Sequence, residues 1–104
     1  MSAPSTPGVG VLLRRVNYSV EELEALVEGY EELRSTRKLW IRVRLVDLSR
    51  AYMRLSKEHQ SAVFLCGFYG LSTRGASPLL NVSHVTVAKR YANGLRAMVR
   101  YLNG

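Results

Sequence analysis

The stretch that decides the fold runs from Gly70 to Arg90 and reads Gly-Leu-Ser-Thr-Arg-Gly-Ala-Ser-Pro-Leu-Leu-Asn-Val-Ser-His-Val-Thr-Val-Ala-Lys-Arg. It contains the parts of a helix-turn-helix, which needs a short helix with an apolar inner face, a tight turn and a second, outward helix. Ala76 and Leu80 supply the apolar face of the first helix. Asn81 suits the turn, because asparagine tolerates the left-handed conformation best after glycine. We therefore predict a sharp turn at Asn81.

The second helix of this motif is predicted to begin after Ser83 and to end at about Leu102. A serine at this position caps a helix by accepting a hydrogen bond from a free N–H of the first turn. Val82 is expected to fill the turn as an apolar plug. An apolar stripe then recurs at helical spacing, formed by Val87, Tyr91, Leu95, Met98 and Leu102. The motif as a whole occupies about residues 72–102.

Pro78 lies inside the first helix of the motif and leaves two interpretations open. Within a helix a proline removes a backbone donor and clashes one turn back, which costs about 3 kcal/mol. Alternatively, Ser77 caps a one-turn helix that begins at Pro78, where a proline is tolerated. The first helix is expected to be kinked or shortened.

A first helix is predicted from about Val20 to Arg34. Ser19 precedes it as the N-cap and Glu22 stands three residues on, which is the arrangement of a capping box. Its apolar face consists of Leu23, Leu26, Val27, Tyr30 and Leu33.

A second helix is predicted over Lys38–Leu55, with two apolar stripes that indicate packing on more than one side. Ile41–Leu45 also alternates as a strand would, but no hairpin partner follows, so we favour the helix. A third helix begins after Ser56, is weakened by Gly67 and stops at Gly70. The predicted fold is all-α, a small helical bundle of four to five helices that ends in the helix-turn-helix.

Length and composition indicate one globular domain. The chain has 104 residues, 47% of them apolar, which is typical of a single folded domain. We expect a flexible tail at 1–17 and a single helical domain at 18–104. No run approaches the roughly 20 apolar residues of a membrane span, and no secretory signal is recognisable. Cys66 is the single cysteine; we interpret it as a small buried hydrophobic residue that fits a reducing cytoplasm.

The charge is unevenly distributed along the chain. Six of the eight acidic residues lie between Glu21 and Glu32. From Leu33 onward there are 13 lysines and arginines against Asp47 and Glu58, and after residue 70 there are five basic residues and no acid. Such a segment attracts polyanions, and nucleic acid or an anionic membrane surface are the usual ones. The acidic face of the first helix either is solvated, contacts a basic partner or shields the chain's own basic surface.

Several positions match a known frame in register and without a gap: Ser56-Lys-Glu-His-Gln60, Val63-Phe64-Leu65, Gly70-Leu71-Ser72, Leu80, Val82-Ser83, Thr86-Val87 and Arg90. Through them, the segment Ser56–Met98 resembles the last domain (region 4) of bacterial sigma factors and its relatives among phage and regulator proteins. The chain departs from that family at Gly75, Ser77 and Asn81, where an acid, alanine and glycine are usual. The resemblance implies that the helix opened by Ser83 is the recognition helix and that Arg90 braces the motif.

The resemblance and the charge together predict a DNA-binding transcription regulator that reads duplex DNA in the major groove, in the cytoplasm of a bacterium or a phage-infected host cell. The expected DNA-binding residues are Arg74, Ser83, His84, Val85, Thr86, Ala88, Lys89, Arg90, Asn93 and Arg96. RNA polymerase and a second copy of the chain are further candidate partners, and no membrane partner is expected.

Two other functions stay open. One is a protein-interaction module that binds RNA polymerase or another regulator without reading a sequence. The other is the DNA-binding part of a phage packaging or recombination complex.

Enzymatic chemistry is not expected. The chain has no Ser–His–acid, paired-carboxylate or phosphate-loop pattern, and His59 and His84 lack the spacing of metal ligands, so neither metal nor cofactor is predicted. The aromatic residues Tyr52, Phe64, Phe68, Tyr69, Tyr91 and Tyr101 are interpreted as core and helix-end residues and not as a base-stacking platform.

Overall fold

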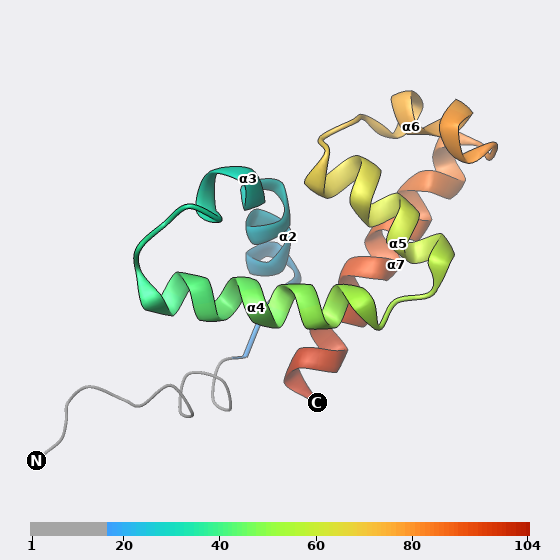
Figure 1. The fold of residues 1–104 in the computed structure, drawn as a ribbon. Coiled ribbons are helices and arrows are strands. Elements are labelled where there is room, and N and C mark those ends of the chain that lie inside the picture. Colours follow the sequence, from blue (N-terminus) through green and yellow to red (C-terminus); the bar gives the residue numbers. More distant parts are fainter. Residues whose placement is uncertain (1–16) are drawn as a thin grey trace, which may run out of the picture.

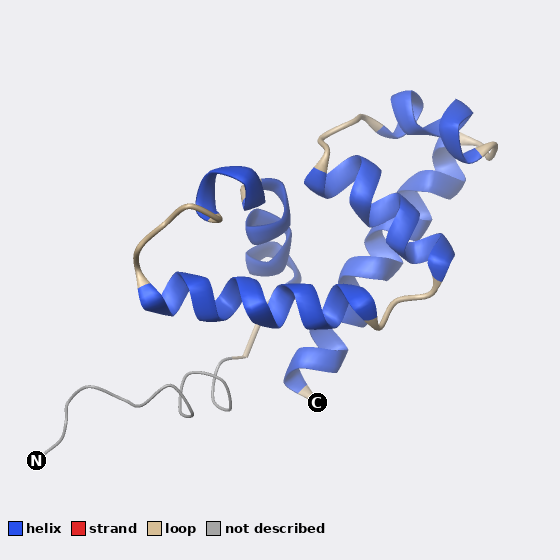
Figure 2. Ribbon diagram, in the orientation of Figure 1, coloured by secondary structure: helices blue, strands red, loops and turns tan. Residues whose placement is uncertain are grey.

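The computed structural model describes residues 17–104, and the predicted tail lies outside them except for its last residue, Asn17. The described chain consists of helices joined by loops (Figures 1 and 2), which confirms the all-α helical bundle. In chain order the elements are α2 (Val20–Glu28), α3 (Tyr30–Leu33), α4 (Leu39–Met53), α5 (Lys57–Val63), the π-helical segment η1 (Phe64–Phe68), α6 (Thr73–Leu80) and α7 (His84–Asn103).

Helix α2 begins with the predicted capping box. The Ser19 hydroxyl accepts from the backbone N–H of Glu22 at 3.1 Å, and the Glu22 carboxylate accepts from the backbone N–H of Ser19 at 3.0 Å. The predicted helix to Arg34 is interrupted at Gly29, whose φ of −95° and ψ of 9° leave helical geometry. Glycine favours such a break because it loses more backbone freedom in a helix than any other residue.

Helix α4 is continuous over Leu39–Met53, so the strand alternative for Ile41–Leu45 is wrong. Its inner face carries Leu45, Leu48 and Ala51 into the core. The buried core residues come from α2, α4, α5, α7 and the segment before α2: Tyr18, Leu23, Val27, Leu45, Leu48, Ala51, Val63, Leu95 and Met98. The core therefore joins the N-terminal helices to the helix-turn-helix.

The sequence predicted that the third helix weakens at Gly67. Instead, α5 continues into the wider π-helical turn of η1 and ends at Phe68. A Cβ on Gly67 would lie 2.3 Å from a methyl carbon of Val27, so α2 packs directly against the η1 backbone. The predicted stop at Gly70 is confirmed by its φ of 89°. Cys66 is half-buried, and burial raises the pKa of its thiol.

Helix α7 is the 20-residue element that holds the domain together, and it contacts α2, α4, α5 and α6. Its closest approach is to α5, where a Cβ on Gly94 would lie 2.7 Å from a methyl carbon of Val63. Helix α6 lies beside the first turns of α7, at the end of the molecule away from α4 (Figure 1). No helix within residues 17–104 has the length and apolar character needed to cross a membrane.

Candidate nucleic-acid interface

The first helix of the motif, α6, begins at Thr73 and continues through Pro78 to Leu80. Its cap is Ser72, whose hydroxyl accepts from the backbone N–H of Gly75 at 3.0 Å. The alternative in which Ser77 caps a helix starting at Pro78 is therefore wrong. The Ser77 hydroxyl instead donates to the Val82 carbonyl and closes the turn that follows.

The turn has the predicted geometry. Asn81 has φ 58° and ψ 39°, the left-handed conformation, and no other non-glycine residue within 17–104 has a positive φ. Ser83 then caps α7 by accepting from the backbone N–H of Thr86 at 3.1 Å. Val82 between them is half-buried. The chain thus turns at Asn81 and starts a new helix three residues later.

Helix α7 has two different faces. Val87, Gly94 and Met98 are buried on the inner one. Val85 and Lys89 are exposed on the outer one, and Val85 keeps 52% of its surface. Asn93 and Arg96 are exposed too, and their spacing from Lys89 places all four side chains on one side of the helix. This side is open to a ligand over about three turns.

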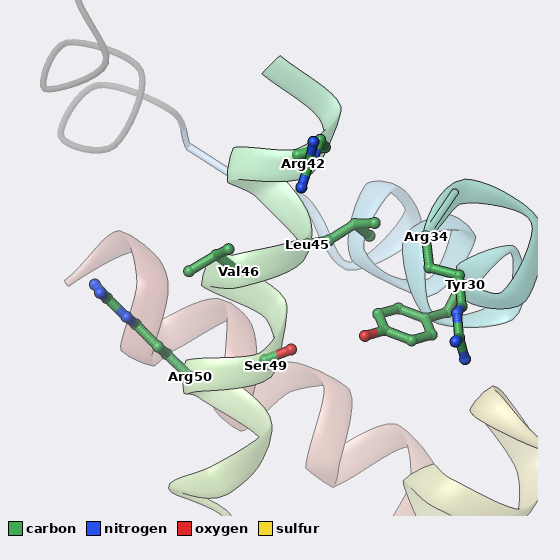
Figure 3. A pocket seen from close by; sticks show the side chains of 7 residues that line it. All are labelled: Tyr30, Arg34, Arg42, Leu45, Val46, Ser49 and Arg50. Carbon is green, nitrogen blue, oxygen red and sulfur yellow. The ribbon is translucent and has the colours of Figure 1, made fainter. Parts of the chain in front are cut away.

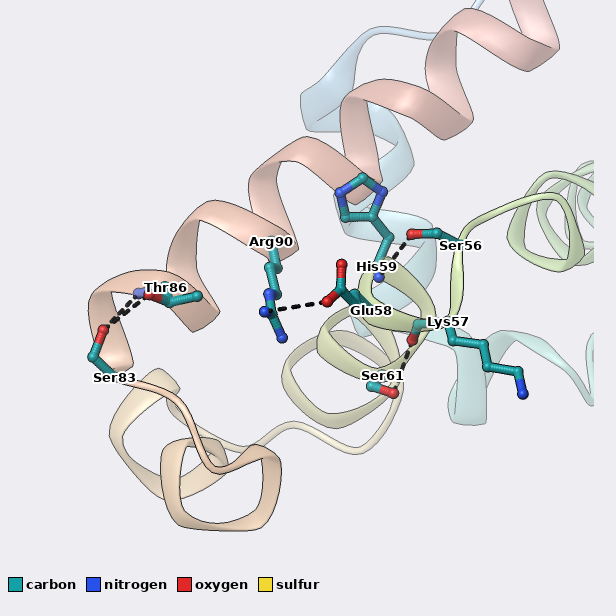
Figure 4. A network of polar contacts seen from close by, with 8 residues as sticks. All are labelled: Ser56, Lys57, Glu58, His59, Ser61, Ser83, Thr86 and Arg90. Atoms are coloured by element: carbon teal, nitrogen blue, oxygen red, sulfur yellow. Dashed lines mark hydrogen bonds and ion pairs between the residues drawn. The ribbon is translucent and has the colours of Figure 1, made fainter.

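Two of the predicted site residues are engaged at the helix start. The hydroxyl of Ser83 donates to the hydroxyl of Thr86 at 3.0 Å (Figure 4). The proton of the Thr86 hydroxyl is left to donate elsewhere, because this hydroxyl is the acceptor in that bond. His84 is half-buried and Ala88 is exposed.

Arg90 lies apart from the outer face. Its guanidinium makes an ion pair with the Glu58 carboxylate at 3.4 Å and so joins α7 to α5 (Figure 4). Its side chain is 27% exposed, against 70% for Glu58. This contact matches the bracing role that the resemblance implied. Among the ten site residues, Arg90 is therefore the one least placed for a ligand.

The outer face of α7 is free of acids. Residues 71–104 contain Arg74, Lys89, Arg90, Arg96 and Arg100 and no aspartate or glutamate. Arg74, Lys89 and Arg96 are exposed, and the guanidinium of Arg96 donates to the side-chain carbonyl of Asn93. Helices α6 and α7 thus expose three cations, two of which, Lys89 and Arg96, share the outer side of α7 with the apolar Val85.

Three of the aromatic residues in the predicted core and helix-end set are exposed. Phe64, Tyr69 and Tyr101 are exposed by 48%, 69% and 46% and lie at the ends of α5, η1 and α7, respectively, so of the predicted core and helix-end places they take the helix ends. Phe64 and Tyr69 stack, with ring centroids 6.5 Å apart. The two rings can stack because the Tyr69 N–H donates a π-helical hydrogen bond to the Phe64 carbonyl at 2.8 Å. This bond places residues five apart on the same side of the helix.

The other aromatic residues of that predicted set, Tyr52, Phe68 and Tyr91, are partly buried and pack against the core. The ring of Phe68 meets Tyr30 and Tyr52 edge-on at 5.2 and 5.3 Å. Tyr91 is half-buried and donates to Glu28 at 3.2 Å, which links α7 to α2. Within the described residues no three His, Cys, Asp or Glu side chains gather as they would around a metal ion.

Comparisons of the chain with protein-family models, with curated proteins and with solved structures found no match. The similarity to sigma region 4 therefore stays a prediction from the sequence. What the site offers must be argued from its own geometry and charge.

Proposed function

We propose that the chain is a transcription regulator that binds duplex DNA with the outer face of α7 in the major groove. The observation that carries this proposal is the pairing of an exposed, acid-free face on α7 with a left-handed turn at Asn81. An α-helix held out in this way fits the width of the major groove. Negative charge repels phosphates, and residues 71–104 contain no aspartate or glutamate.

The side chains suggest how the duplex is held and read. Arg74, Lys89 and Arg96 are exposed cations that would contact phosphates and set the position of the helix. Val85 would contact a thymine methyl group, and the Thr86 hydroxyl would donate to a base edge. The first turn of α7 offers no arginine for a paired contact with guanine, so we expect A·T pairs at the centre of the site.

Selection of bound duplexes from a random library tests this function directly. One enriched motif at physiological salt supports the proposal. With the three phosphate contacts of Arg74, Lys89 and Arg96, log affinity should fall against log salt with a slope of roughly −3. A selection that enriches nothing, with a slope near zero, contradicts it.

Two substitutions distinguish a residue that contacts phosphates from a residue that contacts bases. Lys89→Ala should weaken binding to all duplexes alike and reduce the salt slope by about one. Thr86→Ala should change the preference between sequences. Arg37→Ala is the matched control, because Arg37 is an exposed cation in the loop between α3 and α4, and it should leave both quantities unchanged. Equal effects of Lys89→Ala and Arg37→Ala would show that net charge alone governs binding.

The exposed Phe64–Tyr69 pair favours a second candidate, a protein-interaction module that binds RNA polymerase or another regulator. Exposed aromatic side chains are enriched at protein interfaces. Failure of the selection together with polymerase binding that is lost in Tyr69→Ala would support this second function.

A further inference from the structure

A groove lies between α3 and α4, on a part of the molecule that the proposed DNA site does not use (Figure 3). Its volume is about 290 Å³. Leu45 and Val46 line it with apolar surface, and Arg34, Arg42 and Arg50 surround them with positive charge. Arg42 and Arg50 are exposed and form no ion pair with any residue in 17–104. The groove therefore offers two exposed cations that form no ion pair within 17–104, beside an apolar surface.

The outer face of α4 extends this surface beyond the groove. Leu39, Val46 and Met53 follow one another at intervals of seven residues, so they share one side of the helix. They are exposed by 59%, 49% and 70%, respectively. Arg42 and Arg50 lie between these residues on the same side of α4, so this side alternates exposed apolar residues with cations.

The complementary surface is present on the same chain. The acidic face of α2 and α3 carries Glu21, Glu22, Glu24, Glu28, Glu31 and Glu32. Among these glutamates only Glu31 has an ion-pair partner within 17–104, and that partner is Arg34 at 3.5 Å. The carboxylates crowd one another, since burial and the neighbouring Glu28 raise the pKa of Glu24. Ala25 is exposed between Glu21 and Glu28 and leaves room for a side chain of another molecule.

We propose that the groove between α3 and α4 of one copy receives the acidic α2–α3 face of a second copy. The arginines would meet the glutamates, and Val46 would approach the small Ala25. Two α4 helices cannot pair with each other as well, because Arg42 and Arg50 of one copy would then face like charges. Exposed ion pairs alone are weak, so the apolar row on α4 supplies the rest of the contact.

A charge swap tests the proposal without DNA, so its result is independent of the proposed function. One variant, Arg42→Glu/Arg50→Glu, reverses the groove. The other, Glu21→Lys/Glu32→Lys, replaces two of the six glutamates and so weakens the negative charge of the acidic face, at two exposed carboxylates that make no hydrogen bond or ion pair within 17–104. Sedimentation velocity measures association of each variant alone, of their equimolar mixture and of the wild type. Circular dichroism checks that each variant is folded.

The wild type should self-associate at about 0.01 M salt and less at about 0.15 M, where the Debye length falls from about 30 to about 8 Å. Each variant alone should associate at least about tenfold more weakly, because the groove variant brings like charges together and the face variant loses most of the attraction. The mixture should regain association, because the intact acidic face of the first variant meets the intact groove of the second. The neutral pair Arg42→Gln/Arg50→Gln should lie between, which keeps the test valid if a reversed variant misfolds.

Three results would overturn the proposal. A wild type that stays monomeric at low salt shows that the groove has another occupant, such as an acidic partner protein or an anionic lipid surface. Association of Glu21→Lys/Glu32→Lys at the wild-type strength shows that copies meet through other surfaces. A mixture in which both folded variants remain monomers shows that the two faces do not meet.

Discussion

Asn81 is the residue whose backbone conformation sets the direction of α7. Its φ of 58° is a conformation that costs most residues with a Cβ about 1–2 kcal/mol. Asn81→Ala should therefore lower the free energy of unfolding by about 1 kcal/mol, whereas Asn81→Gly should leave it nearly unchanged. Urea unfolding measures both. An alanine variant as stable as the wild type would mean that the turn relaxes to another conformation.

Single residues with local partners could be predicted from the sequence. Ser19, Asn81 and Ser83 act within three residues of their own position, so the chain alone reveals their roles. The role of Ser77 could not be predicted, because its hydroxyl reaches the Val82 carbonyl across a turn that must already be folded. The N-cap of α6 is Ser72 and not Ser77.

At the scale of elements, the contact between α5 and α7 depends on the missing side chain of Gly94. A Cβ there would lie 2.7 Å from a methyl carbon of Val63, so the two helices would have to move apart. Gly94→Ala should destabilise the fold by about 1–3 kcal/mol, the usual cost of overpacking a core. Thermal or urea unfolding measures the loss.

Val63→Ala provides the matched test, because it removes the methyl carbon that the new Cβ would meet. The double variant should be more stable than the sum of the two single losses predicts, with a coupling of about 0.5–3 kcal/mol. Strict additivity would show that Gly94 matters through backbone flexibility and not through the approach of α5.

The helices could be predicted because apolar residues recur at helical spacing along most of the chain. The interruptions of these helices could not be predicted. A repeat of 3.6 residues gives no sign of the π-helical bond from Tyr69 to Phe64, so the stacking of these two exposed rings could not be predicted. The packing of Val27 against Gly67 joins residues 40 positions apart, and no local pattern contains that information.

At the scale of the molecule, Tyr18 links the beginning of the described chain to the end of α7 and to the middle of α4. Its backbone N–H and carbonyl exchange 2.8 Å hydrogen bonds with the Asn103 side chain. Its hydroxyl donates to the carboxylate of Asp47 at 3.2 Å, and Asp47 is only 7% exposed. Burial raises the pKa of Asp47, while the bond from Tyr18 lowers it.

Tyr18→Phe should lower the free energy of unfolding by about 1–3 kcal/mol at neutral pH, because a buried carboxylate loses a donor. The pKa of Asp47 in the folded state then rises further, so the folded variant holds its proton to higher pH than the unfolded chain. The contribution of Asp47 to the stability of the variant therefore decreases as the pH rises from about 4 to 7, and the deficit relative to the wild type shrinks towards acid. Urea unfolding across this range measures the deficit.

Tyr69→Phe is the control for this experiment, since Tyr69 is 69% exposed. It should leave stability unchanged at every pH. A deficit of Tyr18→Phe that does not vary with pH would place the loss in packing and not in the bond to Asp47.

The position of the candidate site along the chain could be predicted, but the surroundings of its residues could not. The sequence placed Lys89 and Arg96 on a cationic segment, and they are exposed. It did not show that Arg90 reaches Glu58, since that pair depends on how α5 crosses α7. The groove beside α4 was missed for the same reason, as it forms only when α3 folds back over that helix.

The two-sided character of α7 has a consequence for how such a chain can diversify. On the inner side of α7, Val87, Gly94 and Met98 are buried, so nearly any substitution there destabilises the fold. The other side, with Val85, Lys89 and Asn93, touches little of the protein itself. New binding preferences can therefore arise along a single helix by exchanging its outer residues, at almost no risk to the architecture that carries them.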